Sequence, residues 1–274
     1  MKVNLDVVIK SGDDDVDMDY ALETLSGTVS ISCLLAEAIL RGRVKERRTH
    51  ADSVRANLKQ SFKSSYGQKF ELVINDKNLI SKLNKIGKSV FSEVMSYYIR
   101  EALYLEQPSI SNEAASVIDS LCDIEVELVG RLMNPLKQMH RISIESDFDI
   151  ALNYRKPGET YNIACLNQET GMIINAQVEG TSTYEIEAAI TRFNSMTGNG
   201  RLILKDDNEI RTISFGFKDS LKYVTESYKK RISENLHQNN AKKADNRTYI
   251  KLNVYDIKIT NGSVVKFLIK DIKQ

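Results

Sequence analysis

The sequence predicts an α+β fold. We expect an N-terminal small antiparallel sheet with long helices, then a C-terminal small antiparallel β-barrel or sandwich with one inserted helix. Before Ser143, apolar residues recur every three or four positions, which is the period of a helix. After Ser143, apolar and polar residues alternate between turn signals, as they do in short strands. The 274 residues therefore divide into two expected domains, 1–142 and 143–274.

The first domain begins with a strand, because Val3, Leu5 and Val7 alternate with polar residues. A helix over 20–41 follows, with Asp17 or Asp19 as its N-terminal cap. Gly27 lies within that helix and predicts either a close contact with another helix or a bend.

A hairpin and two further helices complete the first domain. Segments 54–62 and 69–74 flank the turn Ser64–Gly67 and predict two paired strands. Apolar stripes over 79–105 and 117–136 predict helices, capped by Asn75 or Asp76 and by Ser109 or Ser111. Pro135 is expected to kink or end the last helix.

The second domain is organised around Glu187–Phe217. This stretch predicts a strand, a turn at Thr197–Gly200, a strand, a polar turn at Asp206–Asn208 and a third strand. Asn261-Gly262 predicts a closing hairpin. The other expected elements are strands at 148–154, 172–178, 184–193, 249–255 and 264–272, a helix at 220–236, and 161–166 as either strand or short helix.

Composition indicates a cytoplasmic protein. The net charge of +1 gives no overall attraction to nucleic acid or membrane. Cys33, Cys122 and Cys165 are widely spaced, which is typical of reduced, buried thiols. The N-terminus has no apolar signal core, and no apolar run approaches the roughly 18 residues of a membrane span. We expect no membrane partner.

The densest positive cluster follows the first helix. It consists of Arg41, Arg43, Lys45, Arg47 and Arg48, and such cations can neutralise nucleic-acid phosphates. The alternative is a solvated helix end, where cations are favoured by the helix dipole. A second candidate surface lies on the β-domain, with Arg192, Arg201 and Lys229–Arg231.

No pattern predicts catalysis or a bound cofactor. His50, His140 and His237 have no spacing typical of metal ligands. Asp15–Asp19 begins like a calcium loop, but Tyr20 stands where glycine is needed, so capping is favoured over a divalent-ion site. Thr197–Arg201 could form an anion-binding nest, although a turn explains both glycines. No G-x-S-x-G elbow is present. We therefore expect no catalytic residues, no metal and no cofactor.

Two short patterns resemble a known family. In the first half, Gly12-Asp13-Asp14 ends the first strand, and Ser64-Ser65-Tyr66-Gly67 leads into Phe70–Ile74. In the second half, Thr197–Arg201 is followed by Thr212–Phe215. Together these resemble an uncharacterised two-domain bacterial family, built of domains of unknown function. The resemblance implies association with mobile elements and a component of anti-phage defence.

The sequence thus favours a non-catalytic interaction protein that binds a protein partner or forms a homo-oligomer. The first alternative is a nucleic-acid-binding module that uses Arg41–Arg48 or the basic surface of the β-domain. The second alternative is an enzyme or small-ligand binder with a pocket between the halves.

Overall fold

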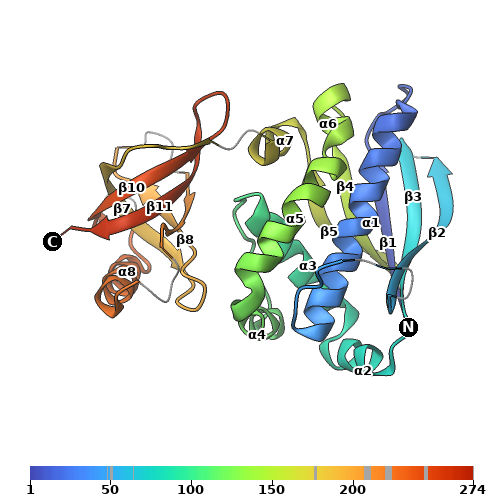
Figure 1. Cartoon of the computed structure of the whole chain (residues 1–274), viewed down its shortest axis with the longest axis horizontal. Coiled ribbons are helices and arrows are strands. Elements are labelled where there is room, and N and C mark those ends of the chain that lie inside the picture. Colours follow the sequence, from blue (N-terminus) through green and yellow to red (C-terminus); the bar gives the residue numbers. More distant parts are fainter. Residues whose placement is uncertain are drawn as a thin grey trace. The chain divides into compact units, whose positions relative to one another are not determined.

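The computed structural model describes residues 1–47, 49, 52–63, 65–175, 178–206, 211–219, 224–243 and 246–273. The chain forms two compact units (Figure 1). The first contains Met1–Leu103 and Gln107–Asn175, and the second contains Tyr104–Glu106 and Ala176–Gln274. Several residues singled out above lie outside the described ranges: Arg48, His50, Ser64, Asp207, Asn208 and Ser220.

The first unit is built on a five-stranded sheet in the order β2-β3-β1-β4-β5. Every neighbouring pair is antiparallel. The first strand and the hairpin are confirmed, and segment 161–166 is a strand. The bounds are β1 (Lys2–Ile9), β2 (Val54–Lys63), β3 (Tyr66–Ile74), β4 (Ile150–Lys156) and β5 (Glu159–Leu166).

This sheet continues past the boundary expected at 142/143. β4 pairs with β1 from Ile9↔Ile150 to Leu5↔Tyr154, so residues after Ser143 supply two strands to the first unit. The division between the compact units comes later than predicted, after Asn175. The spacing of apolar residues could not locate this boundary, because a strand has the same alternating pattern whichever sheet it joins.

Helices cover the face of the sheet that carries Val3, Leu5, Val7 and Ile9, all of them buried. Figure 1 shows α1 and α5 in front of the strands. The bounds are α1 (Met18–Arg41), α2 (Lys77–Ile86), α3 (Lys88–Ala102), α4 (Asn112–Asp119), the 3-10 turn η1 (Cys122–Ile124), α5 (Glu125–Met139), α6 (Arg141–Ser146) and α7 (Gln168–Asn175).

Both long helices expected after the hairpin are divided. The 79–105 helix is interrupted at Gly87, whose φ of +84° lies outside the helical region. The 117–136 helix is split by η1, and α5 runs through Pro135 to Met139. The expected caps are present, because the side chains of Asp76 and Ser111 accept from the free amides that follow them.

The predicted strand 172–178 is wrong. Residues up to Asn175 belong to α7, and only the short β6 (Val178–Glu179) is extended. A short apolar run such as Met172–Ile174 fits a strand or a buried helix equally well. Asn167 favours the helix, since its Oδ1 accepts from the amide of Thr170 at 2.9 Å.

α1 and α5 cross at very close range. A Cβ added at Gly27 would lie 2.6 Å from the carbonyl oxygen of Pro135 and 2.9 Å from Cα of Met139, and closer still to the Met139 amide nitrogen. All three atoms are backbone, so no side chain can move aside. The close helix contact expected at Gly27 is confirmed.

By length and composition, α1 could cross a membrane. However, 61% of its most apolar window is buried inside the structure, which is the state of a core helix. Ile31, Leu35 and Ile39 are fully buried there. Packing within the first unit therefore accounts for the apolar character of α1.

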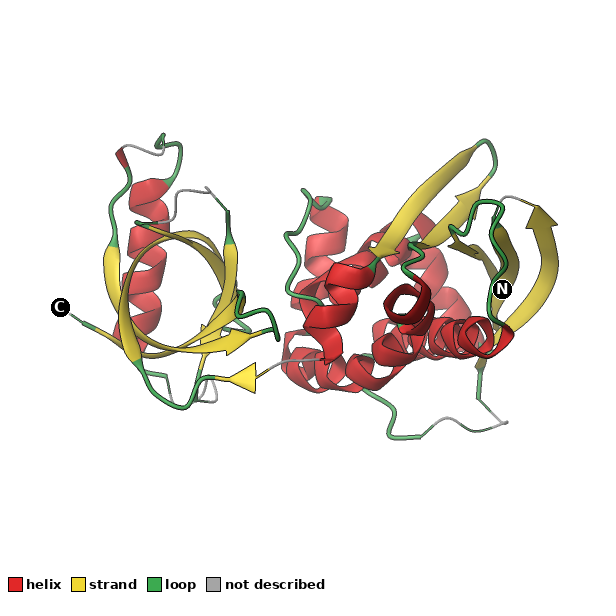
Figure 2. Cartoon of the chain, turned by 90° about the horizontal axis from the view of Figure 1, so that it is seen from above, coloured by secondary structure: helices red, strands yellow, loops and turns green. Residues whose placement is uncertain are grey.

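The second unit is a small closed barrel with the ladder β7-β8-β9-β11-β10. β10 also pairs with β7, which closes the ring that Figure 2 shows end-on. The α+β class, with a barrel that carries one inserted helix, is confirmed. The bounds are β7 (Tyr184–Phe193), β8 (Gly200–Leu204), β9 (Ile213–Phe217), α8 (Glu226–Asn239), β10 (Ile250–Lys258) and β11 (Val264–Ile272).

One strand pair in the barrel departs from the expected antiparallel arrangement. β9 and β11 are parallel, with Lys266↔Ser214 and Ile269↔Phe217 as outer partners. The chain passes through α8 and β10 between these two strands. The barrel strands, numbered in chain order, therefore follow one another around the ring as 1-2-3-5-4, with the helix between strands 3 and 4.

A buried asparagine fastens α8 to the barrel. Asn235 is 2% exposed. Its Oδ1 accepts from the amide of Ile190 at 2.8 Å, and its Nδ2 donates to the carbonyl oxygen of Thr248 at 2.9 Å. Asn235 therefore satisfies two backbone groups on separate segments, next to a register shift in β7.

Candidate nucleic-acid interface

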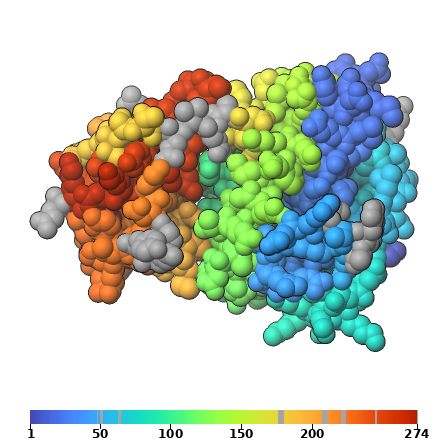
Figure 3. All heavy atoms as spheres, in the orientation of Figure 1, coloured from blue at the N-terminus to red at the C-terminus, as the bar shows by residue number. Residues whose placement is uncertain are grey.

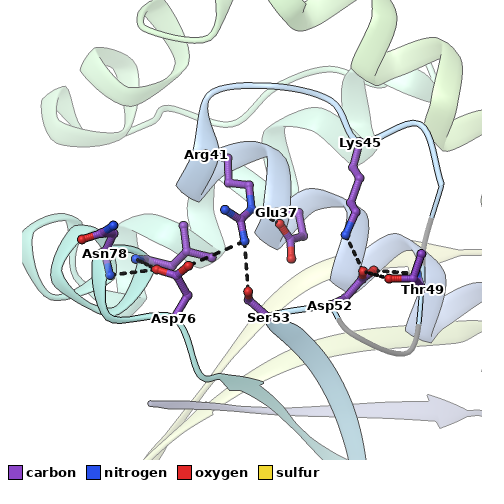
Figure 4. Close-up of polar contacts among 9 residues, drawn as sticks. Glu37, Arg41, Lys45, Thr49, Asp52, Ser53, Asp76 and Asn78 are labelled. Atoms are coloured by element: carbon purple, nitrogen blue, oxygen red, sulfur yellow. Dashed lines mark hydrogen bonds and ion pairs between the residues drawn. The ribbon is translucent and has the colours of Figure 1, made fainter.

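The cationic cluster after α1 is partly used inside the first unit (Figure 4). Arg41, in the last turn of α1, pairs with the buried carboxylate of Glu37. Its Nη2 also donates to Ser53 Oγ at 3.1 Å and lies 4.0 Å from Asp76 Oδ2. Arg41 therefore joins the end of α1 to the start of β2 and to the cap of α2.

Lys45 is held in the same way. It pairs with Asp52, which also accepts from the amide of Thr49 at 3.0 Å and from its hydroxyl at 2.6 Å. Burial alone would raise the pKa of Asp52, but the hydrogen bonds from Lys45 and Thr49 lower it to about 2. The Lys45–Asp52 ion pair therefore holds the segment between α1 and β2 in place.

Of the predicted cluster, two described cations lie exposed at the surface. These are Arg43 and Arg47. Arg41 and Lys45 are committed to carboxylates, so the charge offered to a phosphate backbone is smaller than the sequence suggests.

The two β-domain arginines lie opposite each other on neighbouring strands, with Arg192↔Arg201 in register. Arg201 is 9% exposed. Its Nε donates to Thr212 Oγ1 and its Nη2 to the Thr212 carbonyl oxygen, both at 2.7 Å. It thus fixes the chain before β9, while Arg192 is half-buried.

Two residues of the expected helix surface Lys229–Arg231 make contacts within the second unit, although the Lys230 side chain stays 67% exposed. Lys230 pairs with Glu226 at 2.8 Å, one turn earlier in α8. Arg231 Nη1 donates to the carbonyl oxygen of Ile272 at 3.0 Å.

The structure brings together a surface that sequence reasoning missed. Tyr255, at an outward position of β10, has two lysine ammonium groups over its ring, Lys218 at 4.9 Å and Lys270 at 5.9 Å from the ring centroid. Tyr255 is opposite Leu268 of β11, and Leu268 is opposite Gly216 of β9. We call Lys218, Tyr255, Leu268 and Lys270 the barrel patch.

Part of this signal was present in the sequence. The Asn261-Gly262 hairpin sets Tyr255 and Lys270 on neighbouring strands. Lys218 joins them because β9 and β11 are parallel, and its amide donates to the Ile269 carbonyl oxygen. No local pattern predicts that long-range pairing.

Charge is unevenly distributed along the chain. Residues 176–274 contain 17 Lys and Arg against 12 Asp and Glu, a net charge of +5. Residues 1–175 contain 21 against 25, a net charge of −4. The overall value of +1 therefore conceals a basic second unit.

The described residues contain no group of three or more His, Cys, Asp or Glu side chains placed to hold a metal ion. His140 is fully buried, between the Leu136 carbonyl oxygen at 2.7 Å and Thr170 Oγ1 at 2.9 Å. Burial lowers its pKa to about 4, so it is neutral at physiological pH. Its contacts are those of a helix-linking core residue.

Comparison of the chain with family models, curated proteins and solved structures gave no match. Its function therefore has to be inferred from the geometry of the two units themselves.

Proposed function

We propose that the second unit binds single-stranded nucleic acid on the outer face of β9, β11 and β10, without catalysis. Its ring order of 1-2-3-5-4, with a helix between strands 3 and 4, is that of oligonucleotide- and oligosaccharide-binding barrels. Such barrels bind ligands over strands 2 and 3 and the adjoining loops, and of the three strands of the proposed face only β9 is one of these. This support is an analogy of fold, so the site itself has to carry the proposal.

The observation that carries it is the barrel patch. An aromatic ring on an outer barrel face gives a base a surface for stacking, worth about 1–3 kcal/mol per base. Lys218 and Lys270, whose ammonium groups lie 4.9 and 5.9 Å from the centroid of the Tyr255 ring, can neutralise phosphates next to the stacked base. The net charge of +5 on this part of the chain attracts a polyanion from a distance.

The test is a titration of the full chain with fluorescein-labelled oligothymidine and oligouridine, followed by anisotropy at several salt concentrations. We expect Lys218→Gln/Lys270→Gln to weaken binding at low salt. Each phosphate contact on a single strand contributes about 0.7 to the slope of log affinity against log salt. Loss of two contacts should therefore reduce the slope by about 1.4. Lys230→Gln/Lys243→Gln removes the same charge from α8 and its following loop and should leave that slope unchanged.

A second variant separates stacking from charge. Tyr255→Leu keeps an apolar side chain but removes the ring, and it should weaken binding by roughly 5- to 150-fold with little change in salt slope. Equal slopes for the patch variant and the wild type would refute the proposal. Tighter binding of a duplex than of either single strand would refute it as well.

A further inference from the structure

An apolar groove opens on the surface of the first unit, between α1 and the edge of its sheet. Its volume is about 370 Å³. Most of the lining residues are apolar, among them Leu22, Leu25, Val29, Ala56, Leu58 and Phe70, and the polar ones are Ser26, Thr28, Ser30 and Gln68. Figure 3 shows the atoms of α1, in blue, beside those of β2 and β3, in cyan.

The groove is open because β2 extends beyond the cover of α1. β2 is the edge strand, and Leu58 lies opposite Phe70 of β3, which lies opposite Leu5 of β1. Phe70 and Leu5 are buried, but Leu58 remains 69% exposed. On the other wall, Leu22 is 52% exposed and Met18, one turn earlier, is 73% exposed. Large apolar side chains exposed together mark an interaction surface.

An acidic loop lies at the α1 end of this groove. Asp13, Asp14, Asp15, Asp17 and Asp19 are all exposed. Among the described residues, none of these carboxylates lies within ion-pairing distance of a cation, whereas carboxylates elsewhere in the unit are paired, such as Glu71 with Lys2 at 2.8 Å. The backbone holds the loop in place, because the amide of Gly12 donates to Ser65 Oγ in the β2–β3 turn.

The acidic loop and the apolar groove are adjacent on one helix. Asp19 precedes Leu22 by three positions and Met18 precedes it by four, so all three occupy one helix face. A ligand that fills the groove therefore also meets unpaired negative charge.

We propose that this groove binds a basic amphipathic segment of a partner protein, with an apolar side chain inserted between Leu22 and Leu58 and with Lys or Arg residues over Asp13–Asp19. Charge complementarity selects this occupant. An anionic ligand, such as a fatty acid, would place its head group against five carboxylates. The proposal is independent of nucleic-acid binding by the barrel.

The probe is a fluorescein-labelled helical peptide with leucines on one face and lysines on the other, titrated into the full chain. We expect Leu22→Asn/Leu58→Asn to weaken binding by at least tenfold, because two exposed leucines lose their contact with the peptide. Val126→Asn makes the same kind of change at an apolar residue of α5 that is 75% exposed, and should have no effect. Circular dichroism should show all variants folded.

The charge component is tested apart from the apolar one. Asp13→Asn/Asp14→Asn/Asp15→Asn should weaken binding and flatten its dependence on salt. A matched peptide with glutamate in place of lysine should not bind. The proposal is overturned if the leucine variants bind as the wild type does, if the glutamate peptide or dodecanoate binds as tightly, or if these variants abolish a concentration-dependent dimer instead.

Discussion

Replacing Gly27 by alanine should destabilise the first unit, although alanine is the better helix former. In an open helix the exchange would gain up to about 1 kcal/mol. Here the new methyl group would meet three backbone atoms of α5: it would lie 2.6 Å from the carbonyl oxygen of Pro135 and closer still to the amide nitrogen of Met139. Ordinary contacts begin near 3.4 Å, so the helices would have to separate by about 1 Å.

The magnitude follows from these opposing terms. Overpacking a close-packed interior costs about 1–3 kcal/mol. Because the obstructing atoms are backbone, we take the upper end, and the gain in helix propensity leaves a net loss of about 2 kcal/mol. For a unit of this size, the midpoint of thermal unfolding should fall by roughly 4–8 °C.

Gly130 provides a matched control. It is an exposed glycine of α5, and a Cβ added there meets no atom within 4 Å. Gly130→Ala should therefore raise the midpoint by about 1–4 °C, so one chemical change gives opposite signs at two helix positions. The assay is thermal unfolding by far-ultraviolet circular dichroism. If Gly27→Ala is as stable as the wild type, the close crossing of α1 and α5 is not present in solution.

The remaining predictions concern two buried polar side chains. The pKa of His140 is lowered to about 4, so between pH 6.5 and 4 the unfolded chain binds a proton that the folded chain does not. From this group alone, the free energy of unfolding should fall by about 3 kcal/mol as the pH drops through that range. His140→Gln should remove this share of the pH dependence, measured by urea unfolding. The same pH dependence in the variant and the wild type would contradict the role of His140. Asn235→Leu leaves the Ile190 amide without its side-chain partner and removes one of the two side-chain donors to the Thr248 carbonyl oxygen, the other being Asn239, and it should cost the barrel about 2 kcal/mol. Gln238→Leu, on the exposed side of the same helix, should change stability by no more than about 0.5 kcal/mol, and equal effects of the two variants would contradict the role of Asn235.

The fold class could be predicted from the sequence because it depends on local signals. Alternation at Val3–Val7, the glycine turn before Arg201 and the Asn261-Gly262 hairpin each report on a few neighbouring residues. The errors occurred where local signals are ambiguous. Met172–Ile174 fits either period, and the division after Asn175 depends on β4 pairing with β1, far away in the sequence.

The candidate site was harder to predict for the same reason. Arg41 and Lys45 look like free cations in the sequence, but Glu37 and Asp52 neutralise them in the folded unit. The barrel patch needs Lys218 beside Tyr255, which requires the parallel pairing of β9 with β11. A count of charges gives neither result, because each depends on which side chains the fold brings within reach.

The central position of β1 has a consequence for synthesis on the ribosome. β1 is made first, but one of its two neighbours, β4, begins at Ile150. At about 5–20 residues per second, one long edge of the nascent sheet stays open for on the order of 10 seconds. A fragment ending at residue 142 would keep that edge permanently, and unpaired edges template aggregation. A fragment ending at Asn175 would include both missing strands.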